Sequence, residues 1–142
     1  MKILVLNGPN LNLLGLRETE IYGDVSMDEY LGYLREHFSG HEILYVQSNH
    51  EGDLIDTLHQ HGFTVEGIVI NPGAYTHTSI AIRDAIASIS TPVVEVHISD
   101  IYSREEFRHY SYIKDVCVHQ IIGQGLEGYK QGIQLLLERN SA

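Results

Sequence analysis

The segment from Glu95 to Arg108, EVHISDIYSREEFR, holds the densest group of chemically active side chains in the sequence. His97 and Ser99 stand at the end of an apolar run. Arg104 and Arg108 follow with the four-residue spacing that places two side chains on one face of a helix. An imidazole can transfer a proton near neutral pH, and neighbouring guanidinium groups bind anions. The segment therefore predicts part of a site for an anionic substrate.

The charge balance supports local rather than general anion binding. The chain has 19 acidic and 9 basic residues, with a formal net charge of −10. This balance disfavours nucleic acid as a partner, because binding to phosphates needs a basic face. The less favoured alternative for the segment is an ordinary helix in which Arg104 pairs with carboxylates such as Glu105.

A second polar segment, NPGAYTHTS, runs from Asn71 to Ser79. Its amides, hydroxyls and imidazole could bind a carboxylate or a polyhydroxylated ligand. Alternatively, Thr78 or Ser79 only caps the helix that follows, which leaves Asn71 and His77 unexplained. Both interpretations can hold together.

A third segment, NGPNLNLLGLRETEIYGD, opens the chain after its first apolar run and is long for a connection between a strand and a helix. Long ordered loops are often lids over active sites. We expect a lid at about residues 15–24, with Gly15 and Gly23 as hinges and with Arg17 and Tyr22 between them. A surface loop with an incidental Arg and Tyr is an equally good interpretation of the pattern alone.

Short apolar runs rich in branched residues predict buried strands, at Lys2–Leu6, Ile43–Gln47, Gly67–Ile70, Val93–Ile98 and Cys117–Ile122. Helical periodicity fills the gaps, at about 26–37, 54–58, 80–86 and 126–137, and Ser26 has the position of a capping-box N-cap. This alternation predicts an α/β, flavodoxin-like, doubly wound five-stranded parallel sheet with helices on both faces, in a single catalytic domain spanning 1–142. The three polar segments would meet at the carboxyl ends of the strands, where such sheets bind ligands.

Several other functions are disfavoured by spacing. We expect no metal site, because His59 and His61 are too close in a helix to point the same way and no HExxH motif occurs. Residues 123–128 match GxGxxG, but the chain leaves no room for the strand and acidic residue of a dinucleotide site, so a tight turn is expected. Cys117 has apolar neighbours and should be an inert buried thiol. No apolar stretch reaches the roughly 20 residues of a membrane span and no signal peptide is present, so a cytoplasmic protein is expected.

Taken together, the motifs resemble those of the type II dehydroquinase family. They are NGPNLNLLG, LG-x-RE followed by YG, QSNHEG, N-x-G-x-x-THTS and EVHIS followed by REEFR, in the family's order between about Lys2 and Gly128. The resemblance implies a cofactor-free lyase that removes water from 3-dehydroquinate through an enolate, giving 3-dehydroshikimate in the shikimate pathway. A catabolic role in quinate breakdown would use the same reaction and stays open.

The resemblance also implies catalytic roles. Tyr22 would take a proton from the carbon beside the substrate ketone, with Arg17 as its partner. Because tyrosine normally has a pKa of about 10, such a base needs nearby cations, and Arg108 would also contribute. Asn10 would hold a water that stabilises the enolate, His97 would protonate the departing hydroxyl, and Glu95 would orient His97.

Substrate-binding residues follow from the same resemblance. The carboxylate would meet Asn71, the main chain at Ile98 and Ser99. The ring hydroxyls would lie near His77 and Arg108, and Arg104 would be a partner on the lid side. Asp84 would reach the site of a neighbouring subunit, which implies a homo-oligomer, and the resemblance implies trimers assembled into a dodecamer.

Two positions depart from the common family pattern. Thr19 stands where proline often follows the Arg-Glu pair, which would loosen the lid. Asp100 stands where asparagine is usual, and its charge near the anion site would weaken substrate affinity.

The competing class of function is a flavodoxin-like binding or signalling module. This class is disfavoured for two reasons. The loop that begins at Asn7, after the first predicted strand, is poor in the hydroxyls of a flavin-binding module, and the acidic pair and the lysine of a receiver domain are absent.

Overall fold

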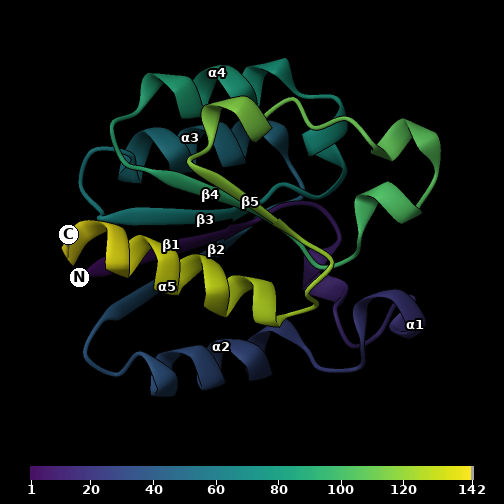
Figure 1. The fold of residues 1–142 in the computed structure, drawn as a ribbon, viewed down its shortest axis with the longest axis horizontal. Helices are drawn as coiled ribbons and strands as arrows, with labels where there is room; N and C mark the ends of the chain where they lie inside the picture. Colours follow the sequence, from purple (N-terminus) through teal and green to yellow (C-terminus); the bar gives the residue numbers. More distant parts are fainter. Residues whose placement is uncertain (142) are drawn as a thin grey trace.

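The computed structural model describes residues 1–141 and is built on a five-stranded parallel sheet (Figure 1). The strands are β1 (Lys2–Asn7), β2 (Glu42–Gln47), β3 (Gly67–Asn71), β4 (Val93–His97) and β5 (His119–Ile122). Their order across the sheet is β2-β1-β3-β4-β5, and every neighbouring pair is parallel. This is the flavodoxin-like order, which confirms the fold class expected from the sequence.

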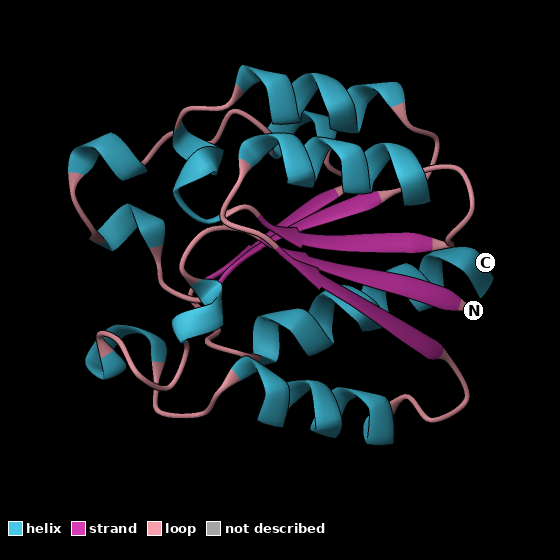
Figure 2. Ribbon diagram, turned by 180° about the vertical axis from the view of Figure 1, so that it is seen from behind, coloured by secondary structure: helices cyan, strands magenta, loops and turns pink. Residues whose placement is uncertain are grey.

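The main helices lie in two layers, one on each face of the sheet (Figures 1 and 2). Helices α2 (Met27–His37) and α5 (Glu127–Ser141) pack against one face, where their apolar side chains meet Ile3, Val5 and Val69. Helices α3 (Glu51–His61) and α4 (Ile80–Ser88) cover the other face. The alternation of side chains along each strand supplies both cores, because successive residues point to opposite faces.

The predicted helix start at Ser26 is confirmed, and of the two candidate caps Thr78 and Ser79 it is Ser79 that caps the later helix. The Ser26 hydroxyl accepts a hydrogen bond from the Glu29 amide at 3.2 Å, and the Ser79 hydroxyl accepts one from the Ile82 amide at 2.9 Å. Each serine satisfies an amide that the first turn of a helix leaves without a partner. Ser79 therefore caps α4, as one of the two interpretations of its segment expected.

The expected helix carrying both Arg104 and Arg108 is wrong. Two short 3₁₀ turns, η3 (Ile101–Ser103) and η4 (Glu106–Arg108), replace it, and Arg104 lies between them with extended backbone at φ −99° and ψ −166°. The Asp100 carboxylate accepts from the Tyr102 amide at 2.9 Å, and the Ser103 hydroxyl donates to the Asp100 carbonyl at 2.9 Å. These local hydrogen bonds compete with helix formation.

The glycine-rich segment 123–128 forms a tight turn between β5 and α5, as expected. Gly123 and Gly125 have φ values of +73° and +60°, which favour glycine. Gly128 is buried, and a Cβ added there would lie 3.1 Å from a methyl carbon of Val96. The segment thus lets α5 approach the sheet closely. Helix α5 itself continues beyond the predicted Leu137 to Ser141.

The loops that follow β1, β3 and β4 gather at the carboxyl edge of the sheet (Figure 2). Between β1 and α2 lie η1 (Leu11–Leu13) and the four-residue helix α1 (Thr19–Tyr22). The first and second loops are pressed together, because the Gly8 amide donates to the Asn71 carbonyl at 2.8 Å. A Cβ on Gly8 would lie 2.5 Å from the Pro72 carbonyl oxygen. In residues 1–141, no helix has the length and apolar character to cross a membrane.

Candidate active site

A cavity of about 120 Å³ opens at the carboxyl edge of the sheet, between the loops after β1, β3 and β4. It is lined by Pro9, Asn10, Leu11, Arg17, Tyr22, Asn71, Gly73, Ala74, His77, His97, Ile98, Ser99, Ile101, Arg104 and Arg108. Residues of all three polar segments therefore face one space, although they are far apart in the sequence.

The cavity collects most of the residues expected at the site. Only Glu95 and Asp84 are missing from its lining. Glu95 is fully buried directly behind His97, to which it is hydrogen bonded. Asp84 lies exposed on α4 and does not reach the cavity of its own chain. Asp100, which departs from the common family pattern in the segment from Glu95 to Arg108, is also absent from the lining and caps η3 instead.

Tyr22 lies at the end of α1, half-buried, with its hydroxyl held from across the cavity. Arg104 donates from Nη1 to this hydroxyl at 2.9 Å and to the Ser99 hydroxyl at 3.3 Å. The guanidinium carbon of Arg17 lies 4.6 Å from the centre of the Tyr22 ring. Two cations thus lie against one phenol, one at its hydroxyl oxygen and the other over its ring.

The three arginines of the cavity make contacts that the sequence did not reveal. Arg104, expected only as a partner on the lid side, is the residue that contacts the Tyr22 oxygen. Arg17 stacks on the ring and pairs with Glu18, whereas Arg108 pairs with Glu105 at 2.6 Å. The alternative interpretation of this segment paired Glu105 with Arg104, but in the structure Glu105 pairs with Arg108. The extended backbone of Arg104 explains its reach, since a helix would have placed it beside Arg108.

His97 and Glu95 form a buried pair on β4. The His97 Nε2 and Glu95 Oε2 atoms are 2.6 Å apart, and the two residues are 5% and 0% exposed. Residues two apart in a strand share a face, so the backbone itself brings the two side chains together. With Nε2 bound to a carboxylate, Nδ1 is the imidazole nitrogen left to serve the cavity.

Three further side chains hold the Glu95 carboxylate. Thr76 donates its hydroxyl at 2.6 Å, Ser111 donates at 2.8 Å, and the Gln120 amide donates at 3.0 Å. Burial alone would raise the pKa of Glu95, but the hydrogen bond and charge of His97 and the hydroxyls of Thr76 and Ser111 hold it below its usual value. The carboxylate is therefore kept ionised inside the protein.

His77 lies beside His97, with the two ring centres 6.4 Å apart. Its Nδ1 bonds the Tyr110 carbonyl oxygen at 2.9 Å, so this nitrogen carries the proton and Nε2 is left for a ligand. Burial lowers the pKa of His77, against the opposing effect of the Tyr110 carbonyl, and the charges of His97 and Arg108 lower it further. A neutral His77 can accept a hydrogen bond from a substrate hydroxyl.

Asn10 has a left-handed backbone at φ 71°, which asparagine tolerates better than most residues. The backbone N–H of Asn10 donates to the Asn49 side-chain oxygen at 3.0 Å. The same oxygen also accepts from the Gln47 side-chain amide at 3.1 Å. Asn49 of the QSNHEG motif thus holds the backbone of the loop after β1 at Asn10. Neither this role nor the contacts of Thr76, Ser111 and Gln120 with Glu95 followed from the sequence, because neutral polar residues show no pattern that marks such contacts.

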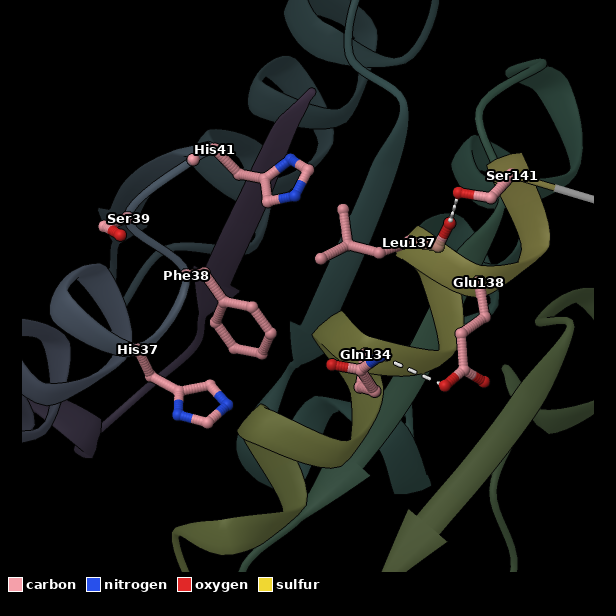
Figure 3. A pocket seen from close by; sticks show the side chains of 9 residues that line it. His37, Phe38, Ser39, His41, Gln134, Leu137, Glu138 and Ser141 are labelled. Carbon is pink, nitrogen blue, oxygen red and sulfur yellow. Dashed lines mark hydrogen bonds between the residues drawn. The ribbon is translucent and has the colours of Figure 1, made fainter.

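A larger groove of about 570 Å³ lies between the end of α2 and the end of α5 (Figure 3). It stands at the amino edge of the sheet, away from the loops that carry the arginines. Its labelled side chains include His37, His41 and Glu138, and the hydrogen bonds drawn are Gln134 to Glu138 and Ser141 to the Leu137 carbonyl, both at 3.0 Å. The described residues that line this groove include no arginine or lysine, whereas three arginines, a tyrosine and two histidines line the smaller cavity. We therefore assign the chemistry to the smaller cavity.

Within the described part of the chain, no three His, Cys, Asp or Glu side chains lie together as metal ligands. His59 and His61 both belong to α3. Cys117 is partly buried, and burial raises the pKa of its thiol, so it stays protonated and unreactive at neutral pH.

Known proteins match this chain over nearly its full length. The family model described as Dehydroquinase class II matches residues 1–137. The 3-dehydroquinate dehydratase of Exiguobacterium sp. (strain AT1b) is 55% identical over 139 residues, covering 97% of this chain and 95% of that protein. The crystal structure of the type II dehydroquinase of Butyrivibrio crossotus has a TM-score of 0.93 at 52% identity, covering 96% of this chain and 97% of that one. This chain belongs to the class II dehydroquinase family.

Proposed function

We propose that the protein is a type II 3-dehydroquinate dehydratase, a hydro-lyase that converts 3-dehydroquinate into 3-dehydroshikimate and water. One observation carries the proposal. A tyrosine hydroxyl bonded to an arginine and a histidine backed by a buried carboxylate line the same small cavity. An elimination beside a ketone needs this combination of a base and an acid. The family and the names of its members support the same reaction.

The reaction begins at Tyr22. As a phenolate, held by Arg104 and with Arg17 over its ring, it takes a proton from the carbon beside the ketone. The electron pair of that bond moves to the ketone oxygen and gives an enolate. Asn10, through a water, would stabilise the charge on this oxygen in the manner of an oxyanion hole.

The enolate then collapses and expels the hydroxyl group from the next carbon. The ketone re-forms, a carbon–carbon double bond appears, and His97 gives the leaving hydroxyl its proton to make water. Glu95 stabilises the histidine while it carries the positive charge. The proton that Tyr22 removed returns to His97 through solvent, so the enzyme is regenerated without a cofactor.

The cations and amides around the cavity account for substrate binding. The carboxylate would accept hydrogen bonds from Asn71, from the Ile98 main chain and from Ser99. The ring hydroxyls would meet His77 and Arg108. The substrate is an anion, and the cavity contains three arginines although the whole chain carries a net charge of −10. This concentration of positive charge favours entry of an anion into a negative protein.

We also propose a homo-oligomer, with trimers assembled into a dodecamer, in the cytoplasm. The exposed position of Asp84 on α4, outside its own cavity, supports its expected contact with a neighbouring site. Residues 1–142 would form one catalytic domain, and residues 15–24 would be its lid. Gly15 and Gly23 have φ values of +91° and +82°, which suits hinges at these positions.

Ultraviolet absorbance on mixing with 3-dehydroquinate tests the proposed reaction, because the conjugated product absorbs and the substrate hardly does. We expect a rise with the wild-type protein that persists after treatment with a chelator and with borohydride. The Tyr22→Phe variant should give no rise. Tyr33→Phe, which changes an exposed tyrosine on α2, is the matched control and should behave as wild type. A folded wild-type protein that gives no rise would overturn the proposal.

A further inference from the structure

A buried polar cluster lies between the sheet and α5, behind the cavity. It consists of Asn7 at the end of β1, Asn71 at the end of β3 and Tyr129 on α5. Asn7 and Asn71 are register partners on neighbouring strands, and all three residues are at most 3% exposed. Among these three, only Asn71 lines the cavity. The cluster therefore connects the C-terminal helix to one wall of the site.

The hydrogen bonds of the cluster have a fixed direction. The Tyr129 hydroxyl donates to the Asn7 side-chain oxygen at 2.8 Å. Since a hydroxyl has a single proton, Tyr129 must accept its second bond, and it does so from the Asn71 amide nitrogen at 3.0 Å. Asn7 in turn donates to the Tyr45 hydroxyl at 3.2 Å. Burial raises the pKa of Tyr129, so the hydroxyl keeps its proton at neutral pH.

This direction determines how Asn71 presents its side chain. Its oxygen accepts from the Gly73 amide at 3.1 Å, and one of its two amide protons goes to Tyr129. The other proton is left for the cavity. If the Asn71 amide were rotated, its nitrogen would face the Gly73 N–H, which is also a donor. Its oxygen would face the Tyr129 hydroxyl, whose single proton is already donated to Asn7. The cluster therefore makes Asn71 a donor toward the cavity.

We propose that Tyr129 is a positioning residue, whose hydroxyl holds the Asn71 amide so that an N–H faces the substrate carboxylate. The inference rests on the proposed function, in which Asn71 binds that carboxylate. It gives α5, which contributes no residue to the cavity lining, a part in substrate recognition. Tyr129 acts on binding of the anion and stands apart from the Tyr22 and His97 proton transfers.

Tyr129→Phe removes the hydroxyl and keeps the ring that packs in the core. We expect KM for 3-dehydroquinate to rise about tenfold, the size expected when one hydrogen bond to a charged group is lost. The value of kcat should change less than about threefold on the same reasoning, because the groups that transfer protons are untouched. A purely structural role for Tyr129 would lower thermal stability without this separation of KM from kcat.

Tyr30→Phe is the matched control. Tyr30 is buried in the same core cluster, on α2, and its hydroxyl donates to Glu127 at 3.3 Å, away from the cavity. This variant should lose some stability and keep the KM of wild type. Asn7→Leu tests the same hydrogen bonds from the other end. It removes the oxygen that accepts the Tyr129 proton, so the Tyr129 hydroxyl is no longer oriented toward Asn71 as an acceptor. Its KM should rise as well.

A double-mutant cycle with Asn71→Ala decides whether Tyr129 acts through Asn71. We expect the double variant to have the KM of Asn71→Ala alone, since Tyr129 then has no amide left to hold. Independent, multiplying effects would overturn the inference, and so would a folded Tyr129→Phe with a KM within about twofold of wild type, a change smaller than a neutral hydrogen bond normally causes. An inactive wild-type protein would instead overturn the proposed function.

Discussion

The side of the cavity around Tyr22, the proposed base, differs from the side around His97, the proposed acid, in burial and in the number of groups that hold it. Tyr22 is half-buried on a four-residue helix, and its oxygen has one hydrogen bond, from Arg104. His97 is 5% exposed at the end of a central strand, and its partner Glu95 accepts from four side chains.

The difference separates a part of the site that is prepared by the core from a part that is completed by a loop. The acid side is positioned by β4 and by buried hydrogen bonds, so its geometry exists without substrate. The base side depends on one contact between a short helix and an arginine on an irregular segment. Substitutions on the acid side should therefore affect stability and activity together, whereas those on the base side should affect activity alone.

The largest effect on stability is expected from Glu95→Gln. A glutamine amide would place donor hydrogens against Thr76 and Ser111 and would remove the charge that pairs with His97. We expect the free energy of unfolding to fall by about 3 kcal/mol, as for other broken buried pairs. Denaturation with urea measures it. Glu105→Gln, at an exposed carboxylate paired with Arg108, is the control and should leave stability unchanged. Equal effects of the two substitutions would erase the contrast between the two sides.

Arg104→Ala tests the base side. We expect kcat to fall about 10- to 100-fold, because a hydrogen bond to a charged group is worth about 1.5–3 kcal/mol. The unfolding midpoint should stay near that of wild type. Steady-state kinetics and thermal unfolding, compared with Arg139→Ala at an exposed position of α5, give both quantities. A large loss of stability would show that Arg104 holds the fold rather than the base.

The pH dependence of stability should come from the acid side. Burial lowers the pKa of His77, so the unfolded chain binds a proton more readily, and stability is lost as pH falls below about 6.5. The lowered pKa of Glu95 acts in the same direction below about pH 4.5. Urea unfolding of wild type and of His77→Gln at pH 7, 6 and 5 separates the effect of His77 from that of Glu95. These values lie in the range of about pH 5–7, in which histidine titrates. An identical slope in both proteins would contradict the assignment to His77.

Thr19→Pro should have the smallest effect and concerns the proposed lid at residues 15–24. Glu18 precedes this position with a left-handed backbone at φ 38° and ψ 52°, whereas proline restricts the residue before it to extended backbone. We expect KM to rise about two- to fivefold, equivalent to roughly 0.4–1 kcal/mol of backbone strain in this segment. Thr19→Ala, which removes the hydroxyl alone, should keep the wild-type KM. A lower KM in Thr19→Pro would mean that the native lid is looser than this conformation.

Sequence reasoning predicted the fold well, because its determinants are local. Branched apolar runs predicted the strands, Ser26 was recognised as a cap from its own neighbours, and the second cap was narrowed to Thr78 or Ser79. The helix joining Arg104 to Arg108 was wrong because spacing alone does not reveal that Asp100 and Ser103 bond their own backbone. The expected effect of the Asp100 charge on substrate affinity stays a prediction, because the structure shows only that its carboxylate accepts a hydrogen bond from the Tyr102 amide.

The supporting groups of the site were out of reach for a different reason. Ser111 lies 16 residues from Glu95, and Tyr129 lies 58 residues from Asn71, so tertiary packing alone brings each pair together. A tyrosine on an apolar helix face is typical of a core residue. Nothing in the sequence around Tyr129 distinguishes its hydroxyl from that of Tyr30.

Exchange of the proton beside the ketone tests the assignment of base and acid most directly. In deuterated water, the His97→Asn variant should lose most product formation but still exchange that proton of 3-dehydroquinate for deuterium, because Tyr22 can form the enolate reversibly. Tyr22→Phe should show neither exchange nor product above the buffer control. Proton NMR follows both reactions in one sample. Exchange that continues in Tyr22→Phe, or that vanishes in a folded His97→Asn, would contradict the two-sided mechanism.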